Sequence, residues 1–238
     1  MSWSGCGNRF RILNEGGRGD VQEKVRGIGI ERMTPRRKGL LLVVSAPSGA
    51  GKTTLCREMS HAVTDLQYSI SYTTRSPRPG EVDGKDYFFV SETEFLEMVA
   101  RNEFAEWAKV HSNLYGTHAG FLRRTMSQGI DVLLDVDVQG ATLLKKRFSD
   151  GIFIFVLPPT MEALMERLRD RRSDTPDEIE RRFRVAKEEI RNFIDYDYII
   201  INDNIKRAVR DLESIIFAER LKISHTDQDW VRKQFLRS

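Results

Sequence analysis

The segment SAPSGAGKTT, residues 45–54, combines residue types that hold phosphate groups. It follows the apolar run of residues 40–44 and matches the pattern G-x-x-x-x-G-K-[ST], with Ala46 in the first glycine position. The backbone N–H groups of such a loop form an anion nest, and the following helix adds its positive N-terminal end. Lys52 is expected to reach the β- and γ-phosphates, and the Thr53 hydroxyl to bind Mg²⁺. The segment predicts a nucleoside triphosphate site, for ATP, and the alternative is a glycine-rich turn with a surface lysine. The predicted ATP-binding residues of the loop are Ala46, Pro47, Ser48, Gly49, Ala50, Gly51, Lys52, Thr53 and Thr54.

A second group of residues suits the phosphate of a monoester. Residues 71–89, SYTTRSPRPGEVDGKDYFF, place Arg75 and Arg78 three positions apart in a turn rich in proline and glycine, with Tyr87 further on. Guanidinium groups donate two parallel hydrogen bonds to a phosphate dianion, whereas lysine offers only a point charge. A solvated turn with two surface arginines is the alternative.

The segment EFAEWAKVHSNLYGT, residues 103–117, carries a carboxylate in apolar and aromatic surroundings. Glu106 could accept hydrogen bonds from N1 and N2 of guanine, while the hydroxyls of Ser71 and Thr117 could donate to O6 and N7. Adenine has no N1–H, so a buried carboxylate left unpaired selects against AMP. The segment therefore predicts a guanine nucleotide as the second substrate.

A cluster of arginines follows in residues 165–183, MERLRDRRSDTPDEIERRF, around an expected loop at residues 170–175. Phosphoryl transfer requires in-line placement and positive charge over the equatorial oxygens of the transferred group. Mobile arginines over the γ-phosphate supply that charge and exclude water. A solvated basic helix face is the alternative. The six residues are Arg167, Arg169, Arg171, Arg172, Arg181 and Arg182.

Taken together, the motifs resemble those of guanylate kinases, from residue 39 to at least residue 219. The resemblance rests on SAPSGAGKTT, TTRSPRPGEVDGKDYFF, EFAEWAKVHSNLYGT and LLDVDVQGA, in that order. It implies Mg²⁺-dependent transfer of the γ-phosphoryl group of ATP to GMP or dGMP. It also implies a P-loop core with a GMP-binding lobe and a small lid. A non-catalytic guanylate-kinase-like protein-binding module is the alternative function.

The resemblance also assigns roles to individual residues. It implies that the GMP phosphate is held by Arg75, Arg78, Tyr87 and Tyr115, and the guanine by Ser71, Glu106, Thr117 and Asp137, with Glu81 supporting the lobe. It implies catalytic roles for Lys52, Arg171, Arg182 and Arg167, an adenine contact from Asn202, and an Mg²⁺ contact from Asp135 beside that of Thr53. Asp137 is alternatively a helix cap. Asp170 and Arg172 depart from the family pattern, which usually has glycines around the lid arginine.

The elements that position these residues follow from the apolar pattern. Uninterrupted apolar runs predict strands buried on both faces, and they alternate with longer amphipathic stretches. That alternation predicts an α/β fold with a mainly parallel sheet flanked by helices. Two capping sequences, Ser91 to Glu94 and Thr175 to Glu178, mark helix starts. The expected strands are residues 40–45, 131–136, 152–157 and 198–201, and the expected helices are residues 51–63, 138–147, 160–170, 176–194 and 204–224.

The chain is expected to form one domain with two insertions, preceded by a tail. The core comprises residues 39–69, 126–159 and 183–238, the GMP-binding lobe residues 70–125 and the lid residues 160–182. Residues 1–38 are expected to form a disordered basic tail. Met33 is an alternative start of the chain, and an arm that binds RNA or anionic lipid is the alternative role.

Composition limits the partners. Nine of the 38 basic residues but only four of the 35 acidic ones lie in the first 38 residues, so the rest of the chain is close to neutral and predicts no nucleic-acid partner. Two cysteines, Cys6 and Cys56, are too few for a disulfide framework, and no apolar run approaches the ~20 residues of a membrane-spanning helix. We expect a cytoplasmic protein whose partners are ATP and GMP, with the oligomeric state left open.

Overall fold

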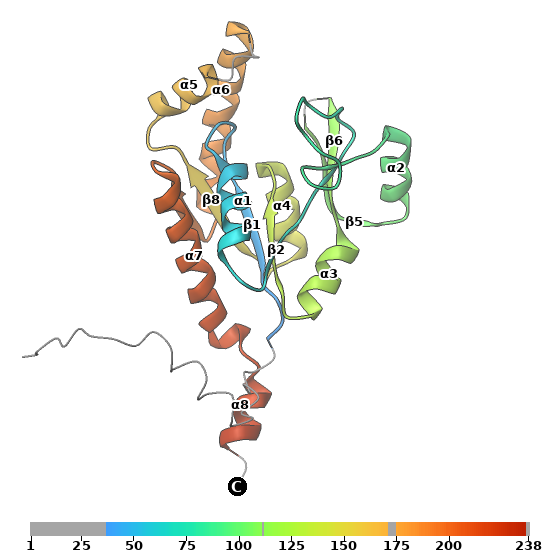
Figure 1. Cartoon of the computed structure of the whole chain (residues 1–238), viewed down its shortest axis with the longest axis vertical. Helices are drawn as coiled ribbons and strands as arrows, with labels where there is room; N and C mark the ends of the chain where they lie inside the picture. Colours follow the sequence, from blue (N-terminus) through green and yellow to red (C-terminus); the bar gives the residue numbers. More distant parts are fainter. Residues whose placement is uncertain (1–36, 111, 171–174, 237–238) are drawn as a thin grey trace, which may run out of the picture. The chain divides into compact units, whose positions relative to one another are not determined.

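The protein is seen here as a computed structural model that describes residues 37–110, 112–170 and 175–236, which form two sheets and the helices around them (Figure 1). The strands are β1 (Leu41–Ser45), β2 (Leu66–Tyr68), β3 (Tyr72–Thr73), β4 (Phe88–Phe89), β5 (Phe104–Val110), β6 (Asn113–His118), β7 (Asp131–Asp135), β8 (Ile152–Leu157) and β9 (Tyr198–Ile201). The helices are α1 (Lys52–Ala62), α2 (Glu92–Ala100), α3 (Ala119–Ser127), α4 (Val138–Arg147), α5 (Met161–Arg169), α6 (Pro176–Ile190), α7 (Ile205–Leu221) and α8 (Gln228–Phe235), with the 3₁₀ turns η1 (Arg191–Asp195) and η2 (Ile223–His225).

The core sheet is parallel throughout, in the order β2-β7-β1-β8-β9, which confirms the expected mainly parallel sheet flanked by helices. Successive residues of β1 point to opposite faces. Leu42 and Val44 pack with α1 and α7 on one face, and Leu41 and Val43 pack with α3 and α4 on the other. The central strands are buried on both faces because helices cover both, and this is why their sequence is uniformly apolar.

A second, smaller sheet forms the lobe inserted between β2 and α3, in the order β4-β3-β6-β5. It packs on α2 through Phe95, Met98, Phe104 and Leu114, with the rings of Phe95 and Phe104 stacked at 4.5 Å. The lobe is joined to the core by Arg147 of α4, whose guanidinium donates to the carbonyl oxygens at the start of β5 at 3.0 and 2.9 Å. These bonds fix the strand that carries Glu106 relative to the core.

The α5 and α6 helices form a hairpin with its own small core of Leu164, Leu168 and Ala186. Thr175 caps α6 by accepting a hydrogen bond from the Glu178 N–H at 3.3 Å, as the capping sequence predicts. The helix ends at Ile190 and continues as the 3₁₀ turn η1, so the expected helix over residues 176–194 is shorter than predicted.

A buried carboxylate, that of Asp131, binds the segment that leads into β1. Asp131, with no exposed surface, is paired with Arg37 and with Arg220 and accepts a hydrogen bond from the Leu40 N–H at 2.8 Å. Arg37 and Lys38 were assigned to the tail by sequence, and they contact the folded domain instead. The remainder of the expected tail, residues 1–36, lies outside the described residues.

The elements β2, α3 and α8 were not predicted from the sequence. None of the helices in the described stretches of chain combines the length and the apolar character that crossing a membrane requires.

Candidate active site

The phosphate loop joins the end of β1 to α1 and depends on two glycines. Gly49 has φ 96° and Gly51 has φ 89°, a left-handed conformation that side chains other than glycine rarely adopt. A Cβ at Gly51 would lie 2.5 Å from Nδ2 of Asn202. The loop therefore requires glycine at both positions, whereas its sequence pattern specifies glycine only at Gly51 of the two.

Lys52, the first residue of α1, lies against the end of β7. Its Nζ donates to the carbonyl oxygen of Val136 at 2.7 Å and forms an ion pair with Asp135. Burial opposes the charge of this ammonium group, but the Asp135 carboxylate outweighs that effect and raises the pKa of Lys52. Lys52 is consequently a cation at neutral pH, positioned beside the predicted metal-binding carboxylate.

Asn202 and Arg167 form hydrogen bonds to the backbone of the phosphate loop. Asn202 Nδ2 donates to the carbonyl oxygen of Ala50 at 2.8 Å, and Arg167 donates to the carbonyl oxygens of Ala50 and Asn202 at 3.4 and 2.8 Å. Neither side chain is among the described residues that line the cleft. Both are predicted to contact the nucleotide or the transferred phosphoryl group, and in the structure both donate to backbone carbonyl oxygens.

The α6 helix reaches the loop at Ser48. Arg182 Nη2 donates to Ser48 Oγ at 2.7 Å, and the Ser48 N–H donates to Glu189 Oε2 at 3.3 Å. Arg171, the other predicted lid arginine, and its neighbour Arg172 lie outside the described residues.

On the lobe, Glu81 organises the two arginines predicted to bind phosphate. Its carboxylate accepts two hydrogen bonds from Arg75, both of 2.9 Å, and one from the Arg78 N–H at 2.7 Å. Burial opposes the charge of Glu81, but these bonds outweigh it and hold the pKa of Glu81 below its ordinary value. The Arg75 guanidinium also lies over the ring of Tyr87, 5.3 Å from its centroid.

Glu106 and Thr117 face each other across the β5–β6 pair. The carboxylate is buried and accepts a hydrogen bond from the Thr117 hydroxyl at 2.6 Å. Burial raises the pKa of Glu106 to about 7; the Thr117 bond works against this rise, and the charge of nearby Asp137 adds to it. Asp137 caps α4 by accepting from the Gly140 N–H at 2.8 Å, so the predicted cap is confirmed.

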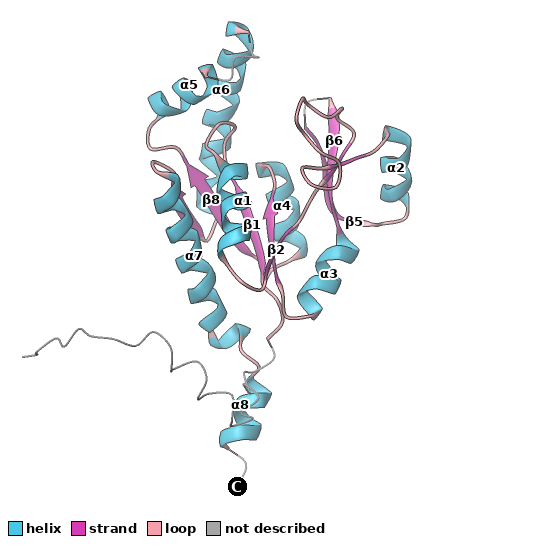
Figure 2. Cartoon of the chain, viewed as in Figure 1, coloured by secondary structure: helices cyan, strands magenta, loops and turns pink. Residues whose placement is uncertain are grey.

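A single cleft of about 1360 Å³ brings the two halves of the site together. In Figure 2 the α5–α6 hairpin and the strands β5 and β6 rise on either side of α1 and α4. Of the predicted residues, the cleft is lined by Ala46, Pro47, Ser48, Gly49, Gly51, Lys52, Thr53, Thr54, Ser71, Arg75, Arg78, Glu81, Tyr87, Glu106, Tyr115, Asp137 and Arg182.

Several lining residues were not predicted. Arg57 of α1 is paired with Asp86 of the lobe, and Gln139, Val185 and Glu189 line the cleft as well. Of these, Glu189 had a detectable signal, because it lies seven residues after Arg182 and hence on the same helix face.

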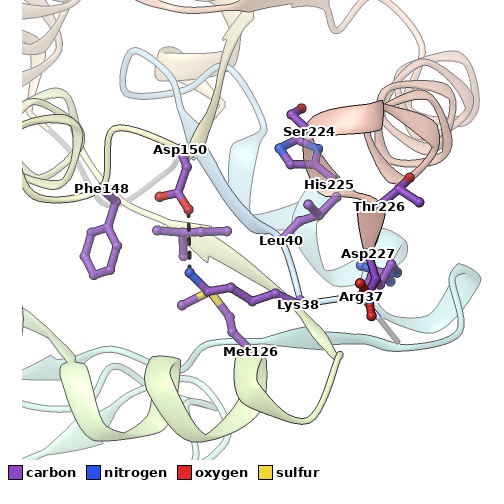
Figure 3. A pocket seen from close by; sticks show the side chains of 12 residues that line it. Arg37, Lys38, Leu40, Met126, Phe148, Asp150, Ser224, His225, Thr226 and Asp227 are labelled. Atoms are coloured by element: carbon purple, nitrogen blue, oxygen red, sulfur yellow. Dashed lines mark ion pairs between the residues drawn. The ribbon is translucent and has the colours of Figure 1, made fainter. Parts of the chain in front are cut away.

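A second cavity of about 260 Å³ lies at the opposite, amino end of β1 (Figure 3). Lys38 and Asp150 meet across it at 3.6 Å, and Leu40, Met126 and Phe148 are among its apolar lining residues. Ligands of open parallel sheets bind at the carboxyl ends of the strands, where the larger cleft lies.

Comparison with known proteins gives one consistent result. A family model described as guanylate kinase matches residues 38–219. The chain is 53% identical over 187 residues to the guanylate kinase of Geobacter sulfurreducens, covering 79% of this chain and 92% of that protein. It is 47% identical over 191 residues to that of Caldanaerobacter subterraneus, covering 80% and 93%.

A solved structure agrees with the sequence comparisons. The crystal structure of guanylate kinase from Anaplasma phagocytophilum superposes with a TM-score of 0.73 at 29% identity, covering 86% of this chain and all of that one. The chain therefore belongs to the guanylate kinase family.

Proposed function

We propose that the chain transfers the γ-phosphoryl group of ATP to GMP, and to dGMP, giving ADP and the nucleoside diphosphate. The observation that carries this proposal is that the phosphate loop, Arg75 and Glu106 line one cleft. A nucleoside triphosphate on the loop and a guanine nucleotide on the lobe would share that space. Membership of the family supports the same reaction and favours it over a non-catalytic binding module.

On the ATP side, the loop N–H groups bind phosphate oxygens while Lys52 supplies a fixed positive charge. Arg182, which lies beside Ser48, covers the γ-phosphoryl group. Because Arg167 donates to the carbonyl oxygens of Ala50 and Asn202, the role we propose for it is to position the loop. The role we propose for Arg171 is to supply positive charge over the transferred phosphoryl group.

On the GMP side, Arg75, Arg78, Tyr87 and Tyr115 bind the phosphate, and Glu81 holds Arg75 in place. An oxygen of the GMP phosphate attacks the γ-phosphorus. The bond to the β–γ bridging oxygen breaks, and ADP leaves with the electron pair. The protein contributes placement and positive charge rather than a covalent intermediate.

The base is selected by Glu106, which accepts hydrogen bonds from N1 and N2 of guanine when it is ionised. Ser71, Thr117 and Asp137 complete the base site. AMP would leave the buried carboxylate unpaired, which costs about 1–3 kcal/mol or more.

The residues near Lys52 fit an Mg²⁺ ion that arrives with ATP. Thr53 and Asp135 offer oxygen donors, the type that Mg²⁺ prefers, and the described residues contain no cluster of three side chains that would hold a metal unaided. When bound, Mg²⁺ neutralises charge on the β- and γ-phosphates. Lys52 keeps the Asp135 carboxylate oriented toward the loop.

The test is release of ADP from ATP and Mg²⁺, in a coupled assay, with GMP, dGMP, AMP, CMP or UMP as acceptor. We expect strong turnover with GMP, weaker turnover with dGMP and little with the others. A wild-type rate with GMP that does not exceed the rate of Lys52→Ala would contradict the proposal.

A further inference from the structure

The Glu189 carboxylate accepts a hydrogen bond from a backbone N–H group of the phosphate loop. Its Oε2 accepts from the Ser48 N–H at 3.3 Å, and its side chain lines the same cleft as Lys52 and Asp137. The N–H groups of such a loop are the donors that bind phosphate oxygens. A carboxylate here therefore presents an anionic oxygen to a group that is suited to a phosphate.

Ser48 forms a second hydrogen bond to the α6 helix, through its side chain. Arg182 donates to Ser48 Oγ at 2.7 Å. Residues 182 and 189 are seven positions apart, about two turns, so both side chains project from one face of α6. The helix is thus joined to Ser48 by a bond to the hydroxyl and a bond from the N–H.

The surroundings of Glu189 make its charge relevant to an incoming anion. Burial raises the pKa of Glu189; the Ser48 N–H and Lys52 work against that rise, and Asp137 adds to it. Glu189 is half-buried in the cleft, and a carboxylate that is partly shielded from water interacts with neighbouring charges more strongly than a fully exposed one. An additional negative group at Ser48 would be repelled by it.

We propose that Glu189 is a positioning residue that competes with the terminal phosphate of ATP for the Ser48 N–H, so that ATP releases one of the two bonds between α6 and the loop. This rests on the proposed function, because Arg182, on the same serine, is the residue that covers the γ-phosphoryl group there. ADP lacks that group and leaves the Glu189 bond intact. Glu189 consequently sets the affinity for ATP relative to that for ADP.

The test compares two variants of neighbouring glutamates. Glu189→Gln keeps the shape and an acceptor oxygen but removes the charge. Glu188→Gln is the matched control, because Glu188 is exposed and forms an ion pair with Arg191 along the helix, at 2.7 Å. Binding of β,γ-imido-ATP and of ADP, each with Mg²⁺ and without GMP, is measured by isothermal titration calorimetry.

We expect Glu189→Gln to bind the ATP analogue about fivefold more tightly than wild type, because charge-assisted hydrogen bonds are about twice as strong as neutral ones. ADP affinity should stay within about twofold, and Glu188→Gln should change neither. Equal changes for both nucleotides, or weaker binding of the analogue, would overturn the inference and leave Glu189 as a support of the loop.

Glu189→Ala provides a second measurement if the glutamine variant does not fold. It removes the acceptor as well as the charge, and it should show the same gain for the ATP analogue over ADP. GMP phosphorylation is assayed separately. A wild-type protein that binds both nucleotides without phosphorylating GMP would refute the proposed function, while the binding comparison would still decide the role of Glu189.

Discussion

The two phosphate sites that we propose for the cleft are built from different parts of the chain. On the ATP side the site is a backbone loop between a buried strand and a helix, with Gly49 and Gly51 in left-handed conformations and Asn202 bonded to the loop from beneath. On the GMP side the site consists of side chains such as Arg75 and Tyr87, which come from a lobe whose strands β3 and β4 have two residues each.

This difference determines what holds each site in place. The backbone site is fixed by the core fold, so its geometry depends little on individual charges. The side-chain site depends on ion pairs and buried carboxyl groups, chiefly Arg75 with Glu81 and Glu106 with Thr117. We therefore expect the GMP side to respond to single substitutions and to pH, and the ATP side to respond to loss of its cation.

The largest effect should come from Lys52→Ala, which removes the cation beside the loop. We expect kcat to fall by about 10³-fold, because the role proposed for Lys52 is to stabilise charge on the transferred group, while the KM for GMP changes little. The coupled ADP assay measures both constants. Lys109→Ala, an exposed lysine on β5, is the control. A fall in kcat of less than about tenfold would mean that the backbone N–H groups of the loop stabilise the phosphates of ATP without Lys52.

The second effect isolates the GMP side. Glu106→Gln replaces one of two acceptor oxygens by an N–H₂ donor, so it should lower kcat/KM for GMP by about 10²-fold and leave the KM for ATP unchanged. Initial rates with each substrate varied in turn measure the split. Glu97→Gln, on the exposed face of α2, is the matched control. Equal losses for both nucleotides would show that Glu106 supports the fold rather than the base.

The core of the fold could be predicted from sequence because its strands are uninterrupted apolar runs. Runs at β1, β7, β8 and β9 were long enough to recognise, whereas β2 has three residues and the lobe strands β3 and β4 have two. Such short strands carry no periodicity, and their pairing depends on contacts distant in sequence. The sequence therefore predicts the lobe as an insertion of short strands and a helix, without the bounds or the pairing of those strands.

The site was predictable to the extent that its residues occur in local motifs. The loop, Arg75 and Glu106 were found because each lies in a segment with recognisable chemistry. The contact between Ser48 and Glu189 joins residues 141 positions apart, and sequence alone does not bring them together. Arg167 was expected at the nucleotide because it belongs to the arginine cluster of the lid, and its hydrogen bonds go to the carbonyl oxygens of Ala50 in the loop and of Asn202 after β9.

A third effect is a pH dependence confined to the GMP side. Glu106 has a pKa of about 7, raised by burial, and it must be ionised to accept hydrogen bonds from guanine. The KM for GMP should therefore rise by up to about tenfold per pH unit below pH 7, while the KM for ATP should not follow it. Initial rates between pH 5.5 and 8.5 test this. A KM for GMP that is constant below pH 7 would contradict it.

The GMP phosphate also titrates, with a pKa near 6, so the profile needs a control. Glu106→Gln keeps the contribution of the phosphate and loses that of the carboxyl group, and the difference between the two profiles reports the ionisation of Glu106.

Because the pKa of Glu106 in the folded protein lies above the ordinary value of 4.5, the folded protein binds more protons than the unfolded chain between about pH 4.5 and 7. Through this group, the free energy of unfolding without GMP should fall as the pH rises across that interval.

The smallest expected effect separates the contributions of burial and of the Thr117 hydroxyl to the pKa of Glu106. Thr117 is fully buried, and its hydroxyl donates to Glu106 at 2.6 Å, which favours the ionised carboxylate. Thr117→Val keeps the shape and removes the donor, at a cost of about 1 kcal/mol or roughly fivefold in the ionisation of Glu106. The midpoint of the pH profile for GMP should therefore move upward by about 0.5–1 unit, with the ATP profile unchanged. An unmoved midpoint would mean that burial alone, and not the hydroxyl, sets the charge of the base site.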